Sequence, residues 1–247
     1  MIKTARSEQK SNYQDLLKTI AIVLMIIDHV PLWLFPASDD ILWMRALGRF
    51  VMPIFCFYAG YNYSKPKQLL LYLGLLLTAL ILIVTGSNIG GNGQAFNMLI
   101  TIYLGQWYLY LMDKYNKTSD LSVLVHCTAL LLITPFTGLI FDYGTLAIAY
   151  MIAGRHQARG HNGLCLLPLL SISTMLLAFD TFSNLRPLYM ALALCCTAAS
   201  AISIAARKPE AAIPINLRYI ARHSLIIYFV NVASFAMIFY VRFFLMR

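Results

Sequence analysis

The chain has 247 residues, of which 60% are hydrophobic and only 12% are charged, with a mean hydropathy of +0.70. A soluble domain carries charges on roughly a quarter of its residues. So little charge cannot cover a water-soluble core of this size, which excludes a soluble globular enzyme, a disordered protein and a disulfide scaffold. The composition therefore indicates an integral membrane protein.

The net charge of +9 does not indicate nucleic-acid binding, because the basic residues are scattered between apolar runs and form no basic face on a folded domain. The five cysteines lie inside apolar stretches in no metal-ligand or disulfide spacing, so no metal centre is expected. The first apolar run, residues 16–35, is too long for the apolar region of a cleavable signal peptide and should stay as a membrane helix.

Apolar runs separated by polar breaks predict an all-α, polytopic membrane helix bundle. A polar tail, 1–15, precedes a single membrane domain, 16–247, with about nine membrane helices. The expected helices are 16–35, 41–63, 68–85, 96–112, 121–137, 141–154, 164–180, 187–206 and 222–244. The sixth is short for a span and fits a tilted or re-entrant segment equally well.

Basic residues gather in alternate breaks of this pattern. Thirteen of the 19 lysines and arginines lie in the segments 1–15, 64–67, 113–120, 154–163 and 207–222. The intervening breaks are acidic or neutral and comprise 36–40, 86–94, 137–142 and 180–184. The positive-inside rule then predicts that the N-terminus and the basic breaks are cytoplasmic.

Polar side chains inside the first helix are the strongest candidates for a site. A charge near the bilayer centre costs about 2.5–3.5 kcal/mol on insertion scales, so such residues are functional hypotheses. Lys18 lies near the cytoplasmic end, and His29 lies about 16 Å further along on nearly the same face. There an imidazole can accept a proton from an attacking amine or hydroxyl. An interfacial histidine beside a solvated aspartate explains the Asp28-His29 pair equally well.

Asp28 should point about 100° away from His29 and pair with an arginine from another helix. Arg45 and Arg49 lie four residues apart, and so on one face of the second helix. Arg45 is expected to reach the outer headgroups near Trp43. Arg49 lies a turn deeper and is the expected partner of Asp28, or of an anionic intermediate, because a guanidinium stays charged and offers forked donors.

Other polar residues are weaker signals. Asn97 and Gln106 are expected to form hydrogen bonds between helices. His156 and His161 lie in a basic break and are expected to be solvated. In the last helix, Tyr228 and Asn231 are expected to face the same cavity as His29.

Two segments of the chain resemble the TraX family: LKTIAIVLMIIDHV at 17–30 and GRFVMPIFCFYAGYNYS at 48–64. The matching residues are Lys18, Asp28, His29, Gly48, Arg49, Pro53, Phe55, Gly60 and Asn62, with a weaker match through Asn97, 142–144 and the last helix. Members of that family are associated with N-terminal acetylation of conjugative pilin, and the TrbP proteins are similar. The resemblance implies a multi-pass protein of the bacterial inner membrane whose partners are a pilin subunit and membrane lipids.

The spacing of Lys18 and His29 also resembles the basic-x10-His signature of acyltransferase-3 families, which transfer acyl groups from acyl-CoA to extracytoplasmic acceptors. The resemblance implies acetyl-CoA as co-substrate and His29 as general base, with Asp28 and Arg49 positioning it or stabilising charge. There are two departures from the pattern. The Arg-x-x-Arg motif of many acyltransferase-3 proteins is absent, and F-type relatives carry a histidine near the place of Asn231.

The anionic phosphates of CoA are expected at the cytoplasmic mouth, where Lys18, Arg218 and Arg222 gather, and Arg45 is a further candidate for cofactor binding. The candidate substrate-binding residues are Tyr58, Asn62, Tyr228 and Asn231. Three alternatives stay open: an acyl-CoA-dependent O-acyltransferase for an extracytoplasmic glycan or lipid, a non-catalytic pilin assembly factor, and a proton-coupled transporter with Asp28 and His29 as its relay.

Overall fold

The computed structural model describes residues 11–35, 41–85, 97–141, 143–182, 187–206 and 208–245. Its elements are α1 (Tyr13–Leu34), α2 (Trp43–Leu47), η2 (Gly48–Phe50), α3 (Val51–Tyr61), α4 (Gln68–Thr85), α5 (Met98–Lys114), α6 (Asp120–Thr137), α7 (Leu146–Ala158), η3 (Gly163–Leu166), α8 (Leu167–Phe182), α9 (Pro187–Ala206), α10 (Arg218–Arg222) and α11 (Ser224–Leu245). The predicted all-α architecture is confirmed for these residues, in which Asn12 and Ala212 form an isolated β-bridge.

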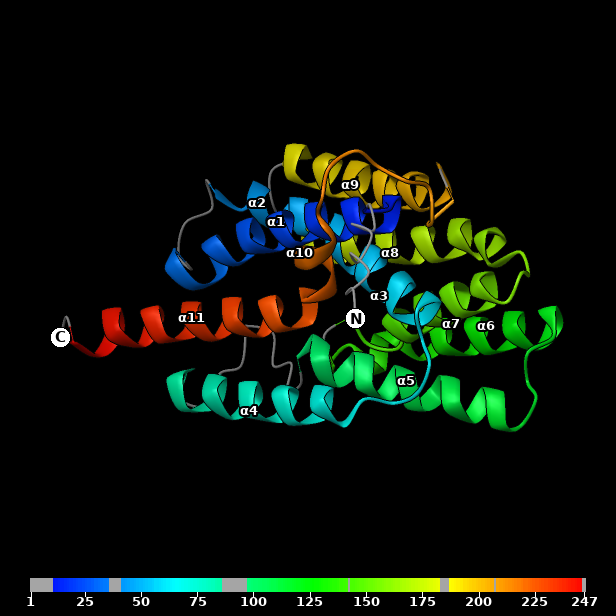
Figure 1. The fold of residues 1–247 in the computed structure, drawn as a ribbon. Helices are drawn as coiled ribbons and strands as arrows, with labels where there is room; N and C mark the ends of the chain where they lie inside the picture. The colour runs from blue at the N-terminus through cyan, green and yellow to red at the C-terminus, as the bar shows by residue number, and fades with distance from the viewer. Residues whose placement is uncertain are drawn as a thin grey trace, which may run out of the picture.

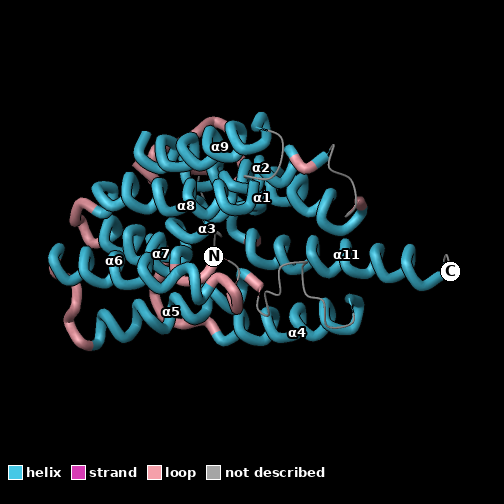
Figure 2. The backbone as a smooth tube through the Cα atoms, turned by 180° about the vertical axis from the view of Figure 1, so that it is seen from behind, coloured by secondary structure: helices cyan, strands magenta, loops and turns pink. Residues whose placement is uncertain are grey.

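The longer helices run roughly along one direction, with α9 at one edge of the bundle and α4 with α5 at the opposite edge (Figures 1 and 2). Each of the nine predicted apolar segments is helical over most of its length. Residues 1–10 of the tail, the breaks 36–40 and 86–94, and Asp142 lie outside the described residues.

Four of the described helices are long and apolar enough to cross a membrane: α1, α6, α9 and α11. Two apolar stretches, Gln68–Val84 and Gly163–Phe179, are shorter than that. Nine spans are therefore not confirmed. The surface nevertheless suits a membrane, because large apolar side chains such as Leu132 and Phe136 are 72% and 73% exposed. Lipid tails can solvate such side chains without the free-energy cost that water imposes.

The prediction of one continuous helix over 41–63 is wrong, because α2 and α3 are separated by the 3-10 turn η2. Pro53 accounts for the interruption. It has no N–H to donate to the carbonyl of Arg49, four residues earlier, and its ring crowds that carbonyl. The interruption holds Gly48 against α1, where a Cβ on Gly48 would lie 2.5 Å from Cγ of Asp28.

Two other boundaries differ from the predicted ones. A short helix that was not predicted, α10, precedes the last predicted helix, 222–244; it ends at its C-cap, His223, and α11 begins at Ser224. Helix α7 continues to Ala158, so Arg155 and His156 lie in its last turn rather than in a solvated break.

The predicted cytoplasmic breaks are joined at one end of the bundle. Arg155 donates to the carbonyl oxygen of Tyr63 at 2.9 Å, and its guanidinium also lies 3.0 Å from the carboxylate of Asp113. These contacts connect the segment that follows α3 with the last turns of α5 and α7. The Tyr61 hydroxyl donates to the carboxylate of Glu210, which adds the segment that follows α9.

The start of α1 lies at this same end. The Ser11 hydroxyl oxygen accepts hydrogen bonds from the backbone N–H groups of Leu217 and Arg218 at 2.6 and 2.9 Å. The N–H of Tyr13 donates to the carbonyl of Ala211 at 2.8 Å. The segments that the charge pattern assigns to one side of a membrane are therefore neighbours in the fold. We call the end of the bundle that they form, with Ser11, Tyr63, Asp113, Arg155 and Glu210, the basic end.

Close packing of α3 against α7 forms the centre of the bundle. A Cβ on Gly60 would overlap the backbone carbonyl of Met151, and a Cβ on Gly154 would overlap the carbonyl oxygen of Phe57. Glycine at both positions lets the two backbones approach closely, as small residues do in membrane helix pairs.

Replacing Gly60 with alanine should therefore destabilise the bundle by about 1–3 kcal/mol, because backbone must move to admit the methyl group. The measurement is the midpoint of thermal unfolding of the purified protein in detergent. Gly138→Ala is the matched control, since the nearest atom to its Cβ is the carbonyl oxygen of Thr134 at 3.2 Å. Equal losses in the two variants would contradict this account of the α3–α7 crossing.

Candidate active site

His29 lies on the buried face of α1, where α11 packs against that helix. Its Nδ1 is 2.5 Å from Oδ1 of Asn231. An amide oxygen only accepts hydrogen bonds, so Nδ1 carries the proton and Nε2 holds the free lone pair. The residue is 8% exposed. A buried imidazole with a fixed tautomer and one basic nitrogen is the arrangement that a general base requires.

Aromatic rings from α11 hold the imidazole from two further directions. The ring centres of Tyr228 and Phe235 lie 6.0 and 6.4 Å from that of His29, both in edge-on orientation. The predicted proximity of Tyr228 and Asn231 to His29 is therefore confirmed, and their roles stay predictions. These partners are about 200 residues from His29 in the sequence.

Asp28 pairs with Arg45, and the predicted pairing with Arg49 is wrong. The Nη1 of Arg45 lies 3.1 Å from Oδ2 of Asp28 and 3.4 Å from its carbonyl oxygen. Arg45 consequently turns toward α1 and does not reach outward as expected. The 3-10 turn η2 advances about 120° per residue instead of 100°, so the two arginines no longer share one face.

Arg49 is buried and packs against the connection between α6 and α7. Its guanidinium carbon lies 5.7 Å from the ring centre of Tyr143, a distance typical of a cation–π contact. Tyr143 has a φ of 61° and Gly144 a φ of 54°, so consecutive left-handed residues form the turn that carries the ring. Sequence reasoning did not pair these residues, although both lie in segments that match the same family.

Lys18 lies in a second group, toward the basic end of α1. Its Nζ is 5.9 Å from the ring centre of Tyr58, a fully buried residue of α3. Lys18 and His29 are about 16 Å apart along the helix. Asn62 closes the end of α3, where its amide donates to the carbonyl of Tyr58 at 2.7 Å. The candidate residues thus divide between two depths of the bundle.

Arg218 and Arg222 are exposed one turn apart on α10, which packs against α1. The hydrogen bonds that the backbone N–H groups of Leu217 and Arg218 donate to the Ser11 hydroxyl hold the start of α10 beside the first turn of α1. Both arginines are thereby kept near the basic end that also includes Lys18.

The weaker polar candidates have defined partners. The amide of Asn97 donates to the carbonyl of Gly74 at 2.8 Å, and Gln106 accepts from the N–H of Lys67 at 2.8 Å. The predicted bond to a neighbouring helix is confirmed for Asn97, whereas the partner of Gln106 lies in the segment just before α4. The expectation that His156 is solvated is wrong, because α7 carries it into a buried position.

Comparison with known proteins identifies the family. Residues 13–239 match the family described as TraX protein. The chain belongs to the TraX family. An uncharacterized protein of Rickettsia prowazekii (strain Madrid E) is 36% identical over 183 residues, which cover 74% of this chain and 71% of that relative. No solved structure matches the chain.

Membership of the TraX family suggests a role in the processing of conjugative pilin and gives coarse support for an acyltransferase. The four long apolar helices of this TraX family member suggest a membrane protein. The match begins at the first residue of α1 and ends within α11. It therefore includes both helices that contribute to the His29–Asn231 pair.

Proposed function

We propose that this TraX family member is an inner-membrane acetyltransferase that transfers the acetyl group of acetyl-CoA to the N-terminal amine of a conjugative pilin. The observation that carries the proposal is the buried His29–Asn231 pair between α1 and α11. The family association with pilin processing supports the choice of acceptor. We propose that the basic end of the bundle faces the cytoplasm, as the positive-inside rule predicts.

In the proposed reaction the pilin amine attacks the thioester carbonyl of acetyl-CoA. Nε2 of His29 takes the proton of the attacking amine, an amide bond forms, the carbon–sulfur bond breaks, and the proton passes to the departing thiolate. Asn231 positions the imidazole through Nδ1. Tyr228 packs beside the imidazole and is the proposed contact for the pilin N-terminus.

The two arginines of the second predicted helix, Arg45 and Arg49, are given different roles. Asp28 and Arg45 neutralise each other next to His29, and their ion pair joins α1 to α2. Arg49 is the proposed stabiliser of negative charge on the thioester oxygen. Arg45 is therefore removed from the group proposed for CoA binding.

Lys18, Arg218 and Arg222 are the residues proposed to bind the CoA phosphates at the basic end. The acetyl-bearing arm of CoA would then extend between α1 and its neighbours toward His29, about 16 Å along the helix. Tyr58 lies beneath Lys18, and we propose that it lines this path. Asn62 holds the end of α3 next to it.

The test is the intact mass of the cognate pilin, purified from cells that do or do not express this chain. We expect one acetyl group at the pilin N-terminus only when the chain is present. Membranes that contain the chain should also transfer labelled acetyl groups from acetyl-CoA to purified pilin. An unchanged pilin mass in both experiments would reject the pilin acceptor. Label on a glycan or lipid would instead identify an O-acyltransferase.

A further inference from the structure

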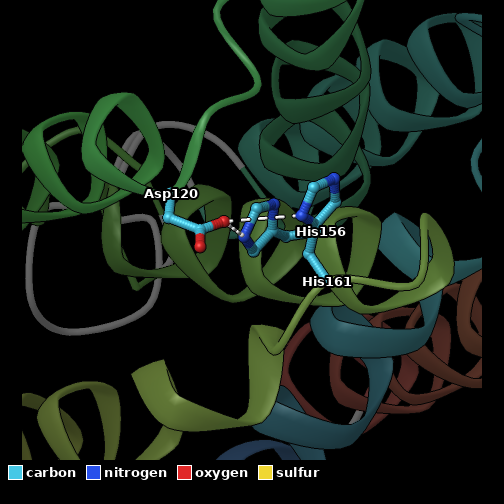
Figure 3. A group of neighbouring side chains, drawn as sticks. All are labelled: Asp120, His156 and His161. Carbon is cyan, nitrogen blue, oxygen red and sulfur yellow. Dashed lines mark hydrogen bonds and ion pairs between the residues drawn. The ribbon is translucent and has the colours of Figure 1, made fainter.

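Three ligand-type side chains, from the predicted basic breaks 113–120 and 154–163, converge on one another (Figure 3). Nε2 of His156 lies 2.9 Å from Oδ1 of Asp120, and Nδ1 of His161 lies 3.5 Å from the same oxygen. The two imidazole rings are stacked, with centres 4.6 Å apart and planes 6° from parallel. One atom from each side chain can be chosen so that all three lie within 4.8 Å of one another.

The local fold brings these residues together. Asp120 is the first residue of α6, after the N-cap Ser119. His156 lies in the last turn of α7, and Gly160, with a φ of 83°, reverses the chain directly after that helix. The N–H of His161 consequently bonds to the carbonyl of His156 at 3.3 Å, which places the second imidazole over the first.

We propose that Asp120, His156 and His161 form a binding site for a divalent transition metal, with Zn²⁺ as the best fit. Zinc bound by imidazole nitrogen and carboxylate oxygen at about 2.1 Å in tetrahedral geometry requires ligand atoms about 3.4 Å apart. Two separations of 2.9 and 3.5 Å already lie near that value. The spacing of the histidines, with four residues between them, falls in the range common in zinc sites.

The donor set decides the class of metal. Two imidazoles and one carboxylate favour zinc, copper or nickel over magnesium or calcium, which prefer oxygen ligands. Three protein ligands leave the fourth tetrahedral position for water or another exogenous ligand. The high exposure of the Asp120 side chain, 83%, leaves that position accessible from solvent.

Neighbouring charges permit a cation at this place. Arg155 and Arg159, which flank His156 in the chain, both bind the carboxylate of Asp113, at 3.0 and 2.6 Å. Burial, together with the neighbouring His161 and Arg159 charges, lowers the pKa of His156 despite the opposing effect of Asp120. A neutral imidazole is the form that binds metals.

A metal at this site would tie the start of α6 to the connection after α7. It would therefore stabilise the basic end of the bundle, where the last turns of α5 and α7 meet the segments after α3 and α9. The inference does not depend on the proposed acetyl transfer, because neither His29 nor the CoA-binding candidates take part.

The test uses the full chain, purified in detergent, stripped with a chelator and titrated with Zn²⁺ by calorimetry. We expect one Zn²⁺ per chain, and a rise in the thermal unfolding midpoint when Zn²⁺ is added. His161→Ala should weaken Zn²⁺ binding on the order of 100-fold or more. Loss of a residue that only hydrogen-bonds to a metal ligand already lowers metal affinity about 10–100-fold, and His161 is a ligand itself. Mg²⁺ at the same concentrations should not compete.

Two further variants make the outcome decisive. Asp120→Asn keeps the size of the side chain but replaces the anionic ligand, and it should also lose tight Zn²⁺ binding. His223→Ala removes a histidine whose Nδ1 bonds to the carbonyl of Tyr219 on α10, and it should bind Zn²⁺ like the unchanged protein. Absence of one-to-one binding, or equal binding by His161→Ala and the unchanged protein, would overturn the proposal.

Discussion

Replacement of His29 by alanine should lower the rate of pilin acetylation by a factor on the order of 10²–10⁴, the usual contribution of a general base. The reason is the loss of Nε2, the proton-accepting atom that the Asn231 bond leaves free. The measurement is the rate of labelled acetyl transfer to pilin by membranes with matched amounts of protein. His126→Ala is the matched control, because that imidazole bonds to Tyr108 on α5 and lies outside the site.

Variants at Asn231 test the same pair from the other helix. Asn231→Leu removes the acceptor for Nδ1 and should lower kcat while leaving KM for acetyl-CoA nearly unchanged. Asn231→Asp keeps an acceptor oxygen in a side chain of similar size and should restore much of the rate that leucine loses. If His29→Ala transfers acetyl groups as fast as the control, His29 is not the base. If the leucine and aspartate variants behave alike, Asn231 does not position it.

Breaking the ion pair between Asp28 and Arg45 should have the second-largest effect. Arg45→Leu leaves a carboxylate in an apolar bundle without its partner, and we expect a loss of about 1–3 kcal/mol of stability. A fully buried pair would lose more, but the Arg45 side chain keeps 27% of its surface exposed. The measurement is again the thermal midpoint in detergent.

A double-mutant cycle separates the pair from its surroundings. Asp28→Leu together with Arg45→Leu removes both charges and should recover part of the stability that either single change loses. Arg49→Leu is the informative comparison, because its guanidinium contacts Tyr143 and not Asp28. Additive losses in the Asp28 and Arg45 variants would contradict a direct pair.

Local properties of the sequence predicted the helices well. Hydropathy identified the segments 68–85 and 187–206 with the observed bounds. An apolar run leaves water whether it packs against protein or lipid, so its helix can be recognised without knowledge of its neighbours. The charge pattern grouped the breaks that meet at the basic end. Prediction failed at η2, where Pro53 removes a backbone hydrogen bond, so the side chains on the two sides of the turn no longer follow one 100° step.

Side-chain partners were mostly beyond the sequence. A 100° step per residue indicates where Arg45 and Arg49 point on an unbroken helix, but the 3-10 turn reverses which of them reaches Asp28. The Asp120 cluster was missed for a similar reason. Its histidine spacing was visible, yet only the extension of α7 and the reversal at Gly160 place both imidazoles on one carboxylate.

By itself, the sequence determined that the protein is an apolar helical bundle with one basic end, and its motifs indicated the TraX family. These properties are local, since they follow from composition, run length and the placement of charges. The tertiary structure alone decided that His29 meets Asn231, that Asp28 meets Arg45 and that Asp120 meets two histidines. Such contacts join segments far apart in the chain, and their geometry depends on how the helices pack.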